Sequence, residues 1–212
     1  MWGALADVVM FVVSMFCFDP LDNWLIFRPD RSEQIWRFFT YMVLHSGWLH
    51  LGVNVVSQLL VGLPLEMVQS WERVSAVYVC GVLSGSLATA VFDHGVCLVG
   101  SSSGVYSLLA AHLANVSLNY HKMEFGLLSI LGVLIIGGVD TVLIVYDRFA
   151  LSGAQLAPSV SYLAHLAGAL SGLTVGLGIF RASASKRPLA AWISLGVALA
   201  CFLFLALMNV FR

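Results

Sequence analysis

The sequence contains little charge. Only 10% of its 212 residues are Asp, Glu, Lys or Arg, whereas 60% are hydrophobic. A soluble domain carries about a quarter charged residues, and a soluble fold of this size has no interior large enough for so much apolar surface. The formal net charge is −1, without the clustered basic face that a nucleic-acid partner needs. We therefore expect a lipid bilayer, and not nucleic acid, to cover the outside of the protein.

The spacings that hold metals and disulfides are also missing. The four cysteines are scattered without a CxxC pair, and no HExxH pattern occurs. We expect no metal, no organic cofactor and no disulfide framework. The first residues do not resemble a signal peptide, because Asp7 stands where basic residues are expected and no small-residue cleavage site precedes Asp19.

Long apolar segments follow one another along most of the chain. A helix needs about 20 mostly apolar residues to cross a bilayer. Seven segments approach or reach this length, at residues 2–18, 38–60, 74–92, 103–118, 125–146, 159–180 and 189–210. The predicted fold class is an all-α polytopic membrane protein. Lysine and arginine are divided evenly between the two sets of loops, so charge does not fix the orientation.

Polar residues gather near the starts of the second, fourth and sixth segments. These are His45, His50 and Asn54, then the serines 101–103, and then His165. Successive helices alternate in direction, so all three starts lie at one face of the membrane. Imidazole and hydroxyl groups inside a membrane are costly and usually face the protein interior or a watery cavity. A nucleophile, a base and hydrogen-bond donors at one depth are the parts of an acyl-transfer site.

Two spacings within the helices support this interpretation. His50 and Asn54 are four residues apart and share one helix face, so both can donate hydrogen bonds to a single point, as an oxyanion hole requires. Gly168, Gly172 and Gly176 form a stripe of small residues that allows another helix to approach closely. Packing alone would explain the glycines, but it would not explain His165 beside them.

The run Gly100-Ser101-Ser102-Ser103-Gly104 stands where a loop becomes a helix. Glycine permits a tight turn there. On local evidence alone, capping of the helix accounts for the serines at least as well as catalysis does. Chemistry also leaves open which of the three adjacent serines would be a nucleophile.

At these residues the chain resembles the rhomboid family of intramembrane serine proteases. The resemblance rests on four patterns in the family's order: Trp36-Arg37 with His45-xxxx-His50-xxx-Asn54, Gly62-xxx-Glu66, Gly100-Ser101-Ser102-Ser103-Gly104-Val105-Tyr106, and Ala164-His165-xx-Gly168-xxx-Gly172. It implies that Ser102 is the nucleophile and His165 the general base. It also implies that His50, Asn54 and a backbone N–H near Ser102 hold the oxyanion, and that Tyr106 packs against His165.

Other polar residues receive non-catalytic roles. The resemblance implies that Trp36 and Arg37 shape the first loop, and that the catalytic pair needs no carboxylate. We weighed Asp140 as a third catalytic member and favour a structural hydrogen bond to a neighbouring helix instead. His112 and Asn115 lie about 15 Å further along their helix than Ser102 and are expected to join helices. His94 and His121 are expected in solvated loops.

The resemblance also implies an organisation and a function. We expect a single rhomboid domain over 1–212, with a six-helix core at about 1–181 and one extra transmembrane helix at about 188–210. The extra C-terminal helix resembles the secretory-pathway, growth-factor-releasing branch. Its substrates would be single-pass membrane proteins, including precursors similar to epidermal growth factor, in the ER, Golgi or plasma membrane. The alternatives are a catalytically inactive relative that acts in trafficking or quality control, and a small transporter.

Overall fold

The computed structural model describes residues 24–150, 161–184 and 188–211. The predicted first span, 2–18, lies outside these residues. The described part is helical, and its extended pairing is limited to an isolated antiparallel bridge between Phe27 and Leu98. The predicted all-α fold is confirmed.

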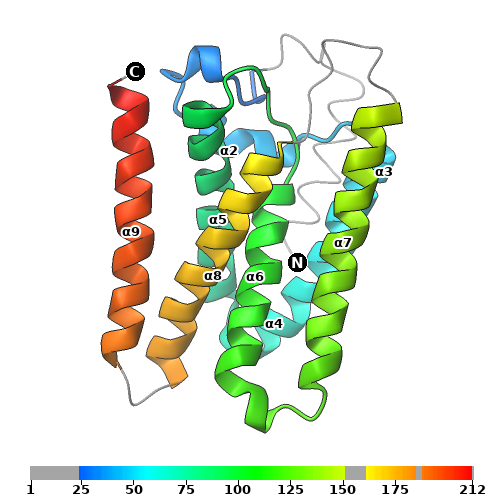
Figure 1. Ribbon diagram of the computed structural model, residues 1–212, viewed down its shortest axis with the longest axis vertical. Helices are drawn as coiled ribbons and strands as arrows, with labels where there is room; N and C mark the ends of the chain where they lie inside the picture. The colour runs from blue at the N-terminus through cyan, green and yellow to red at the C-terminus, as the bar shows by residue number, and fades with distance from the viewer. Residues whose placement is uncertain (1–23, 151–160, 185–187, 212) are drawn as a thin grey trace.

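The helices form a bundle around one central element (Figure 1). In chain order they are α2 (Arg37–Thr40), α3 (Trp48–Ser57), α4 (Leu63–Gln69), α5 (Trp71–Phe92), α6 (Ser102–Asn119), α7 (Gly126–Ala150), α8 (Tyr162–Ala184) and α9 (Pro188–Val210). Helix α6 runs through the middle of the bundle, while α7 and α9 stand at opposite edges. Helices α6 and α8 both begin at the upper end in this view, as the predicted site requires.

Four described segments are long and apolar enough to cross a membrane: Trp48–Gln69, Trp71–Phe92, Tyr162–Phe180 and Leu189–Val210. The chain is therefore a multi-pass integral membrane protein. Helix α6 is not among the four, because serine, histidine and asparagine residues lower its hydropathy. It has no need of a lipid-compatible surface on all sides, since most of its residues are buried against neighbouring helices.

The second predicted span, 38–60, is not one helix, and the prediction was wrong over its first part. Helix α2 continues into a short 3-10 turn at Tyr41–Val43, and the chain is non-helical until α3 begins at Trp48. The first element ends at Val43, where Leu44 turns to an extended conformation, and Gly47, with a φ of +105° that residues with a side chain rarely adopt, directly precedes α3. The helical path then continues beyond residue 60, through a π-helical turn at Gln58–Gly62, and ends at Gln69.

The closest helix contact lies between α6 and α8. A Cβ atom added at Gly168 would lie 2.2 Å from the Ser103 carbonyl oxygen, and one added at Gly172 would lie 2.0 Å from the Ser107 carbonyl oxygen. Neither position has space for any side chain. The predicted role of the small-residue stripe, close approach of another helix, is confirmed.

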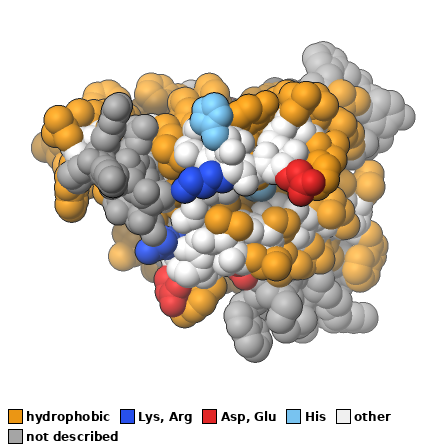
Figure 2. Space-filling model, turned by 90° about the horizontal axis from the view of Figure 1, so that it is seen from below, with side chains coloured by type: hydrophobic (Ala, Val, Ile, Leu, Met, Phe, Trp, Pro, Cys, Tyr) orange, Lys and Arg blue, Asp and Glu red, His pale blue; other side chains and the backbone are white. Residues whose placement is uncertain are grey.

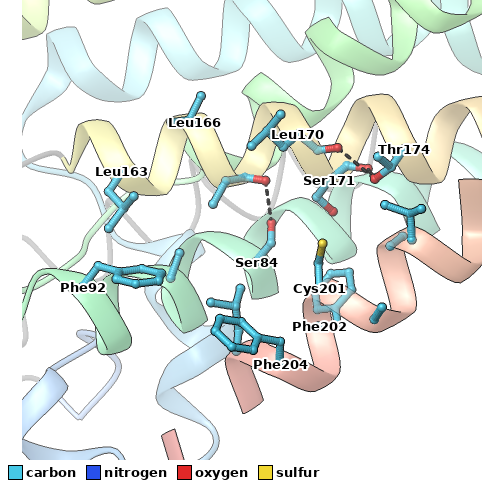
Figure 3. Close-up of a pocket in the computed structure, with 16 residues that line it drawn as sticks. Ser84, Phe92, Leu163, Leu166, Leu170, Ser171, Thr174, Cys201, Phe202 and Phe204 are labelled. Carbon is cyan, nitrogen blue, oxygen red and sulfur yellow. Dashed lines mark hydrogen bonds between the residues drawn. The ribbon is translucent and has the colours of Figure 1, made fainter. Parts of the chain in front are cut away.

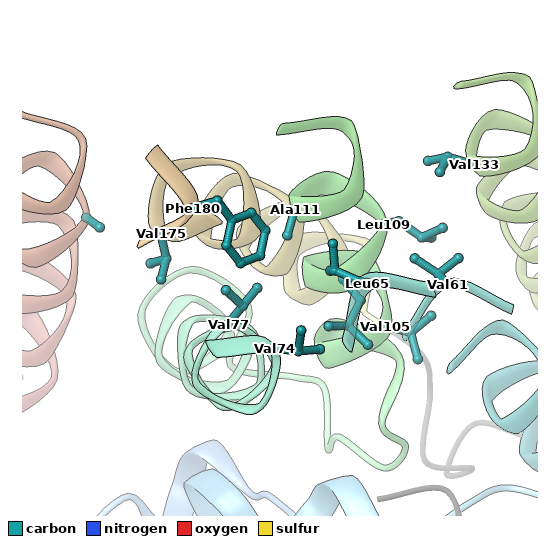
Figure 4. Packing of buried hydrophobic residues seen from close by; sticks show 12 residues of the cluster. Val61, Leu65, Val74, Val77, Val105, Leu109, Ala111, Val133, Val175 and Phe180 are labelled. Atoms are coloured by element: carbon teal, nitrogen blue, oxygen red, sulfur yellow. The ribbon is translucent and has the colours of Figure 1, made fainter. Parts of the chain in front are cut away.

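Below this contact the bundle has a conventional apolar core (Figure 4). Phe180 of α8 is fully buried, and its ring points into the space between Val77 of α5 and Ala111 of α6. Seen from below, this end of the molecule carries several charged side chains and a histidine among polar and hydrophobic ones (Figure 2). That arrangement fits a protein whose ends face water and whose sides face lipid.

Helix α9 touches α8 at one end and diverges from it toward the other (Figure 1). Near the lower end, a Cβ at Gly178 would lie 2.5 Å from Leu195 Cγ. Toward the upper end, a cavity of about 600 Å³ lies between α5, α8 and α9, lined by hydrophobic side chains such as Phe92, Leu170 and Phe204 (Figure 3). Ser84, at its wall, donates a hydrogen bond to the Ala167 carbonyl oxygen at 3.1 Å.

Candidate active site

The site begins with the sharp turn that precedes α6. Gly100 has a φ of +107°, and its N–H donates to the Tyr41 carbonyl oxygen at 3.0 Å. A Cβ atom at this position would lie 2.6 Å from Cε1 of the His50 ring. Glycine is therefore required twice, for its conformation and for the close approach of the imidazole.

Each of the three serines after this turn has a different side-chain partner. Ser101 Oγ lies 3.2 Å from His45 Nε2, and Ser103 Oγ lies 2.6 Å from the Tyr41 hydroxyl, which itself donates to the Val82 carbonyl oxygen. Ser102 Oγ lies 2.7 Å from His165 Nε2. The structure thus separates three residues that the sequence chemistry left equivalent.

The Ser102–His165 pair joins two helices that are 63 residues apart in the sequence. Ser102 is the first residue of α6, and His165 lies in the first turn of α8. Both side chains are buried, with exposed fractions of 6% and 5%. The close approach at Gly168, one turn after His165, is what brings the imidazole within hydrogen-bond distance of the hydroxyl.

Tyr106 lies one turn after Ser102 and covers the imidazole. Its ring stacks on His165 with centroids 4.2 Å apart and planes inclined by 14°. This contact confirms the predicted packing of Tyr106 against His165. The Tyr106 hydroxyl donates to the Gly137 carbonyl oxygen at 3.2 Å and lies 2.9 Å from Thr141 Oγ1, so the ring is also tied to α7.

The sequence is also similar to those of known proteins. Residues 32–182 match the rhomboid domain. The chain belongs to the rhomboid family. It is 45% identical over 163 residues to Rhomboid-related protein 3 of Homo sapiens, covering 76% of this chain and 40% of that protein. It is 38% identical over 196 residues to Rhomboid-related protein 2 of Mus musculus, covering 90% of this chain and 64% of that protein.

A third relative is named as inactive. Inactive rhomboid-related protein 2 of Caenorhabditis elegans is 34% identical over 178 residues, which cover 83% of this chain and 50% of that protein. Across these three relatives the chain spans 40% to 64% of their lengths. Membership of the rhomboid family therefore does not by itself separate a protease from an inactive relative.

The two predicted oxyanion donors, His50 and Asn54, have different surroundings in the structure. The His50 ring lies against Gly100, beside the turn that carries the serines, and its Nδ1 lies 3.0 Å from Ser46 Oγ. The Asn54 amide donates to the His50 carbonyl oxygen one turn earlier at 2.8 Å. Asn54 thus bonds to its own helix, and no hydrogen bond joins it to Ser102 among the described residues.

His45 is a residue whose position the sequence prediction misplaced. It does not lie on a helix, since it falls in the non-helical stretch between Val43 and Trp48. From there its ring contacts His50 edge to face, with centroids 5.3 Å apart, and its Nε2 reaches Ser101. His45 therefore supports the turn before α6 from outside the helix that carries His50 and Asn54.

The first loop is held by the two residues that the rhomboid motif singles out. The Arg37 guanidinium donates to the Ile26 carbonyl oxygen at 2.6 Å, and the Trp36 indole donates to the Trp24 carbonyl oxygen at 3.1 Å. Further out, a hydrogen bond from Arg28 holds the pKa of the Asp30 carboxyl below its usual range. These contacts agree with the predicted structural role of Trp36 and Arg37.

A cavity of about 250 Å³ opens beside the imidazole. Its walls come from three helices, and the residues that line it are Tyr106, Thr141, Tyr162, His165, Leu166 and Ala169. The cavity lies between α7 and α8 and reaches the stacked pair of Tyr106 and His165. Of the Ser102–His165 pair, it is His165 that lines this cavity.

The remaining polar residues lie away from the pair. Asn115 accepts a hydrogen bond from Gln69 of α4 at 2.7 Å, so its predicted role in joining helices is confirmed. His94 and His121 are exposed in turns, as predicted. Asp140 is buried in α7, and no hydrogen bond between Asp140 and His165 occurs among the described residues.

Proposed function

We propose that the protein is an intramembrane serine endopeptidase that uses Ser102 and His165 as a catalytic dyad. The observation that carries this proposal is the 2.7 Å separation of Ser102 Oγ and His165 Nε2, in a buried position with an adjacent cavity. A hydroxyl is a weak nucleophile until a neighbouring base accepts its proton, and a nucleophile within hydrogen-bond reach of a base is the signature of covalent catalysis.

The reaction would proceed in two halves. Ser102 Oγ attacks the substrate's peptide carbonyl carbon while His165 Nε2 takes the hydroxyl proton. The tetrahedral intermediate collapses, the C–N bond breaks, and His165 returns the proton to the leaving amine. A water molecule then attacks the acyl-enzyme ester, losing its proton to His165, and the Ser102 hydroxyl is restored as the carboxylic product leaves.

Stabilisation of the oxyanion is assigned to His50, Asn54 and the backbone N–H groups at the start of α6. The position of the His50 ring against Gly100 supports this assignment, and the first N–H groups of a helix are free to donate at its positive dipole end. Asn54 would need to exchange its bond to the His50 carbonyl oxygen for one to substrate. Its contribution is therefore expected to be smaller than that of His50.

The substrates that fit this site are single-pass membrane proteins. An intact transmembrane helix hides its carbonyls in backbone hydrogen bonds, so a substrate should carry Gly, Pro or polar residues that weaken its helix near the cut. We further propose the secretory pathway as the location, and growth-factor precursors similar to epidermal growth factor as substrates. The support is the helix α9 that follows the histidine helix, the feature in which the chain resembles the secretory-pathway branch.

The adjacent serines offer a matched test. Ser102→Ala should abolish labelling by a fluorophosphonate probe and reduce cleavage of tagged single-pass substrates by at least about 10³-fold. Ser101→Ala and Ser103→Ala remove the same atom one residue away and should retain labelling at a level that follows the amount of folded protein. Labelling of the Ser102→Ala protein at the wild-type rate would refute the assignment of the nucleophile.

Two other functions remain as alternatives. The similarity to Inactive rhomboid-related protein 2 supports a non-catalytic binder, and it would be favoured if folded wild-type protein neither reacts with the probe nor cleaves any substrate in the panel. Buried His and Asp residues could instead line an ion path. Ion flux into proteoliposomes that is insensitive to Ser102→Ala would favour a transporter.

A further inference from the structure

Helix α3 begins with a contact that runs backward along the chain. Gly47 is its N-cap residue and supplies no side-chain hydrogen bond, and His50 stands in its first turn. The imidazole reaches back across Gly47 to Ser46. The Ser46 backbone N–H donates to His50 Nδ1 at 3.4 Å, and Ser46 Oγ lies 3.0 Å from the same nitrogen. Two groups of Ser46 therefore meet one nitrogen of His50.

The simplest explanation of this contact is that it caps the helix. In a capping box, the side chain of the third helical residue accepts a hydrogen bond from a backbone N–H just before the helix, and Glu or Gln usually supplies the acceptor. His50 is the third residue of α3. An imidazole differs from Glu and Gln in this position, because the nitrogen that accepts also determines where the proton of the ring lies.

The backbone hydrogen bond determines the tautomer of His50. A backbone N–H can only donate, so His50 Nδ1 must accept and carries no proton. The imidazole is then neutral, and its one proton is on Nε2. The Ser46 hydroxyl can donate or accept, and beside an unprotonated Nδ1 it donates.

The protonated nitrogen faces the turn that carries the serines. A Cβ atom added at Gly100 would lie 2.9 Å from His50 Nε2 and 3.7 Å from Nδ1, so Nε2 is the nearer of the two nitrogens. Gly100 stands two residues before Ser102. In the opposite tautomer, the nitrogen at this turn would have no proton and could not donate to an oxyanion.

Further contacts hold the ring and its backbone in place. The rings of His45 and His50 meet at 65° with centroids 5.3 Å apart, and His45 Nε2 lies 3.2 Å from Ser101 Oγ. Asn54 donates to the His50 carbonyl oxygen at 2.8 Å. A half-turn of the imidazole about its Cβ–Cγ bond would put a carbon atom where Nδ1 now meets Ser46. The Ser46 contacts therefore fix both the orientation and the tautomer of the ring.

We propose that Ser46 is a positioning residue that holds His50 as the neutral tautomer with its proton on Nε2, directed at the turn before Ser102. The inference rests on the proposed function where it assigns His50 to the oxyanion, but not where it concerns the tautomer. Ser46 touches neither the substrate nor the reacting atoms in this role. It acts through His50.

The tautomer can be measured without a substrate. In protein with isotope-labelled histidine nitrogens, assigned by comparison with His50→Gln, Nδ1 of His50 should resonate as an unprotonated nitrogen at neutral pH and Nε2 as a protonated one. Ser46→Ala removes the hydroxyl, so the Nδ1 resonance should move toward that of an unprotonated nitrogen without a hydrogen bond. Ser46→Thr keeps the hydroxyl and should leave the resonance in place.

A matched control is available in Ser117→Ala. Ser117 is also exposed, and its hydroxyl donates to the Ala114 carbonyl oxygen near the other end of α6. This variant should leave the His50 resonances unchanged. A protonated Nδ1 in the wild-type protein, or an Nδ1 resonance that responds to Ser46→Ala no more than to Ser117→Ala, would overturn the proposal.

The rate test is a double-mutant cycle with His50. Ser46→Ala should lower kcat about 10-fold with KM unchanged, because an oxyanion is stabilised in the transition state and not in the bound substrate. Ser46→Thr should restore the rate. In a His50→Ala background, Ser46→Ala should have no further effect. A rise in KM without a fall in kcat, or a loss that persists undiminished without His50, would overturn the role of Ser46 in catalysis.

The two measurements keep this proposal distinct from the proposed function. If the His50 resonances behave as expected in a protein that neither reacts with the fluorophosphonate probe nor cleaves a substrate, the tautomer assignment stands and the protease function fails. If Ser102→Ala abolishes cleavage while the Nδ1 resonance ignores Ser46→Ala, the protease function stands and the positioning role of Ser46 fails.

Discussion

Helix α8 has two interfaces, and they are built in opposite ways. Toward α6 its glycines lie against backbone, so that an added Cβ at Gly172 would meet the Ser107 carbonyl oxygen at 2.0 Å. Toward α9 the helices meet near Gly178 and then separate around a cavity of about 600 Å³. The Ser102–His165 hydrogen bond lies at the tight interface. The difference shows that the closest packing occurs where two hydrogen-bonded side chains come from separate helices.

The largest expected effect comes from filling the tight interface. Gly172→Leu should lower the free energy of unfolding by more than about 4 kcal/mol, because neither helix backbone can move aside without displacing the other. Unfolding in mixed detergent micelles measures this loss, and the fluorophosphonate probe should no longer label Ser102. The matched control is Gly196→Leu on α9, where an added Cβ meets nothing within 4 Å and stability should change by less than about 0.5 kcal/mol.

A smaller effect is expected from removing a ring below the tight interface. Phe180→Ala should cost about 3 kcal/mol, since the ring is fully buried and leaves a cavity that the neighbouring helices cannot close. Phe204→Ala removes the same ring at the α9 cavity, where the side chain is 55% exposed, and should cost less than about 1 kcal/mol. Equal losses for the two variants, measured by the same unfolding titration, would remove the distinction between the interfaces.

The smallest expected effect concerns single hydroxyl groups. Ser107 Oγ donates to the Val77 carbonyl oxygen at 2.8 Å, so Ser107→Ala should cost about 1 kcal/mol. Ser171 Oγ is buried at the α9 cavity and has no hydrogen-bond partner among the described residues. Ser171→Ala should therefore be neutral or slightly stabilising. A loss with Ser171→Ala as large as that with Ser107→Ala would mean that the loose interface closes more tightly than the structure shows.

The parts of the fold that the sequence predicts are those set by long-range periodicity. Apolar length located the helices that became α5 to α9 to within a few residues. Alternating helix direction brought Ser102 and His165 to the same end of the bundle, and the small-residue stripe predicted the contact that joins them. These signals depend on many residues or on simple geometry, so a single local exception does not destroy them.

The parts that could not be predicted depend on individual contacts. The break before α3 runs from Leu44, which is extended, to Gly47, which has a positive φ. The mean hydropathy of a window of about 19 residues does not locate so short an interruption. The separate partners of Ser101 and Ser103 come from His45 and Tyr41, which are 56 and 62 residues away in the sequence. Local chemistry cannot distinguish three adjacent hydroxyl groups, because their difference lies in which distant residue each one meets.

That division of partners among the three serines has a consequence for living cells. Loss of the Ser101 or Ser103 hydroxyl would remove a contact between the turn and its supports, and the protein would reach its membrane in reduced amounts, because small losses of stability are amplified by chaperones and proteases. Loss of the Ser102 hydroxyl would leave abundance normal. Substitutions of three neighbouring serines would thus give two phenotypes. Loss of Ser101 or Ser103 would lower the amount of protein, and loss of Ser102 would remove the proposed proteolysis without lowering it.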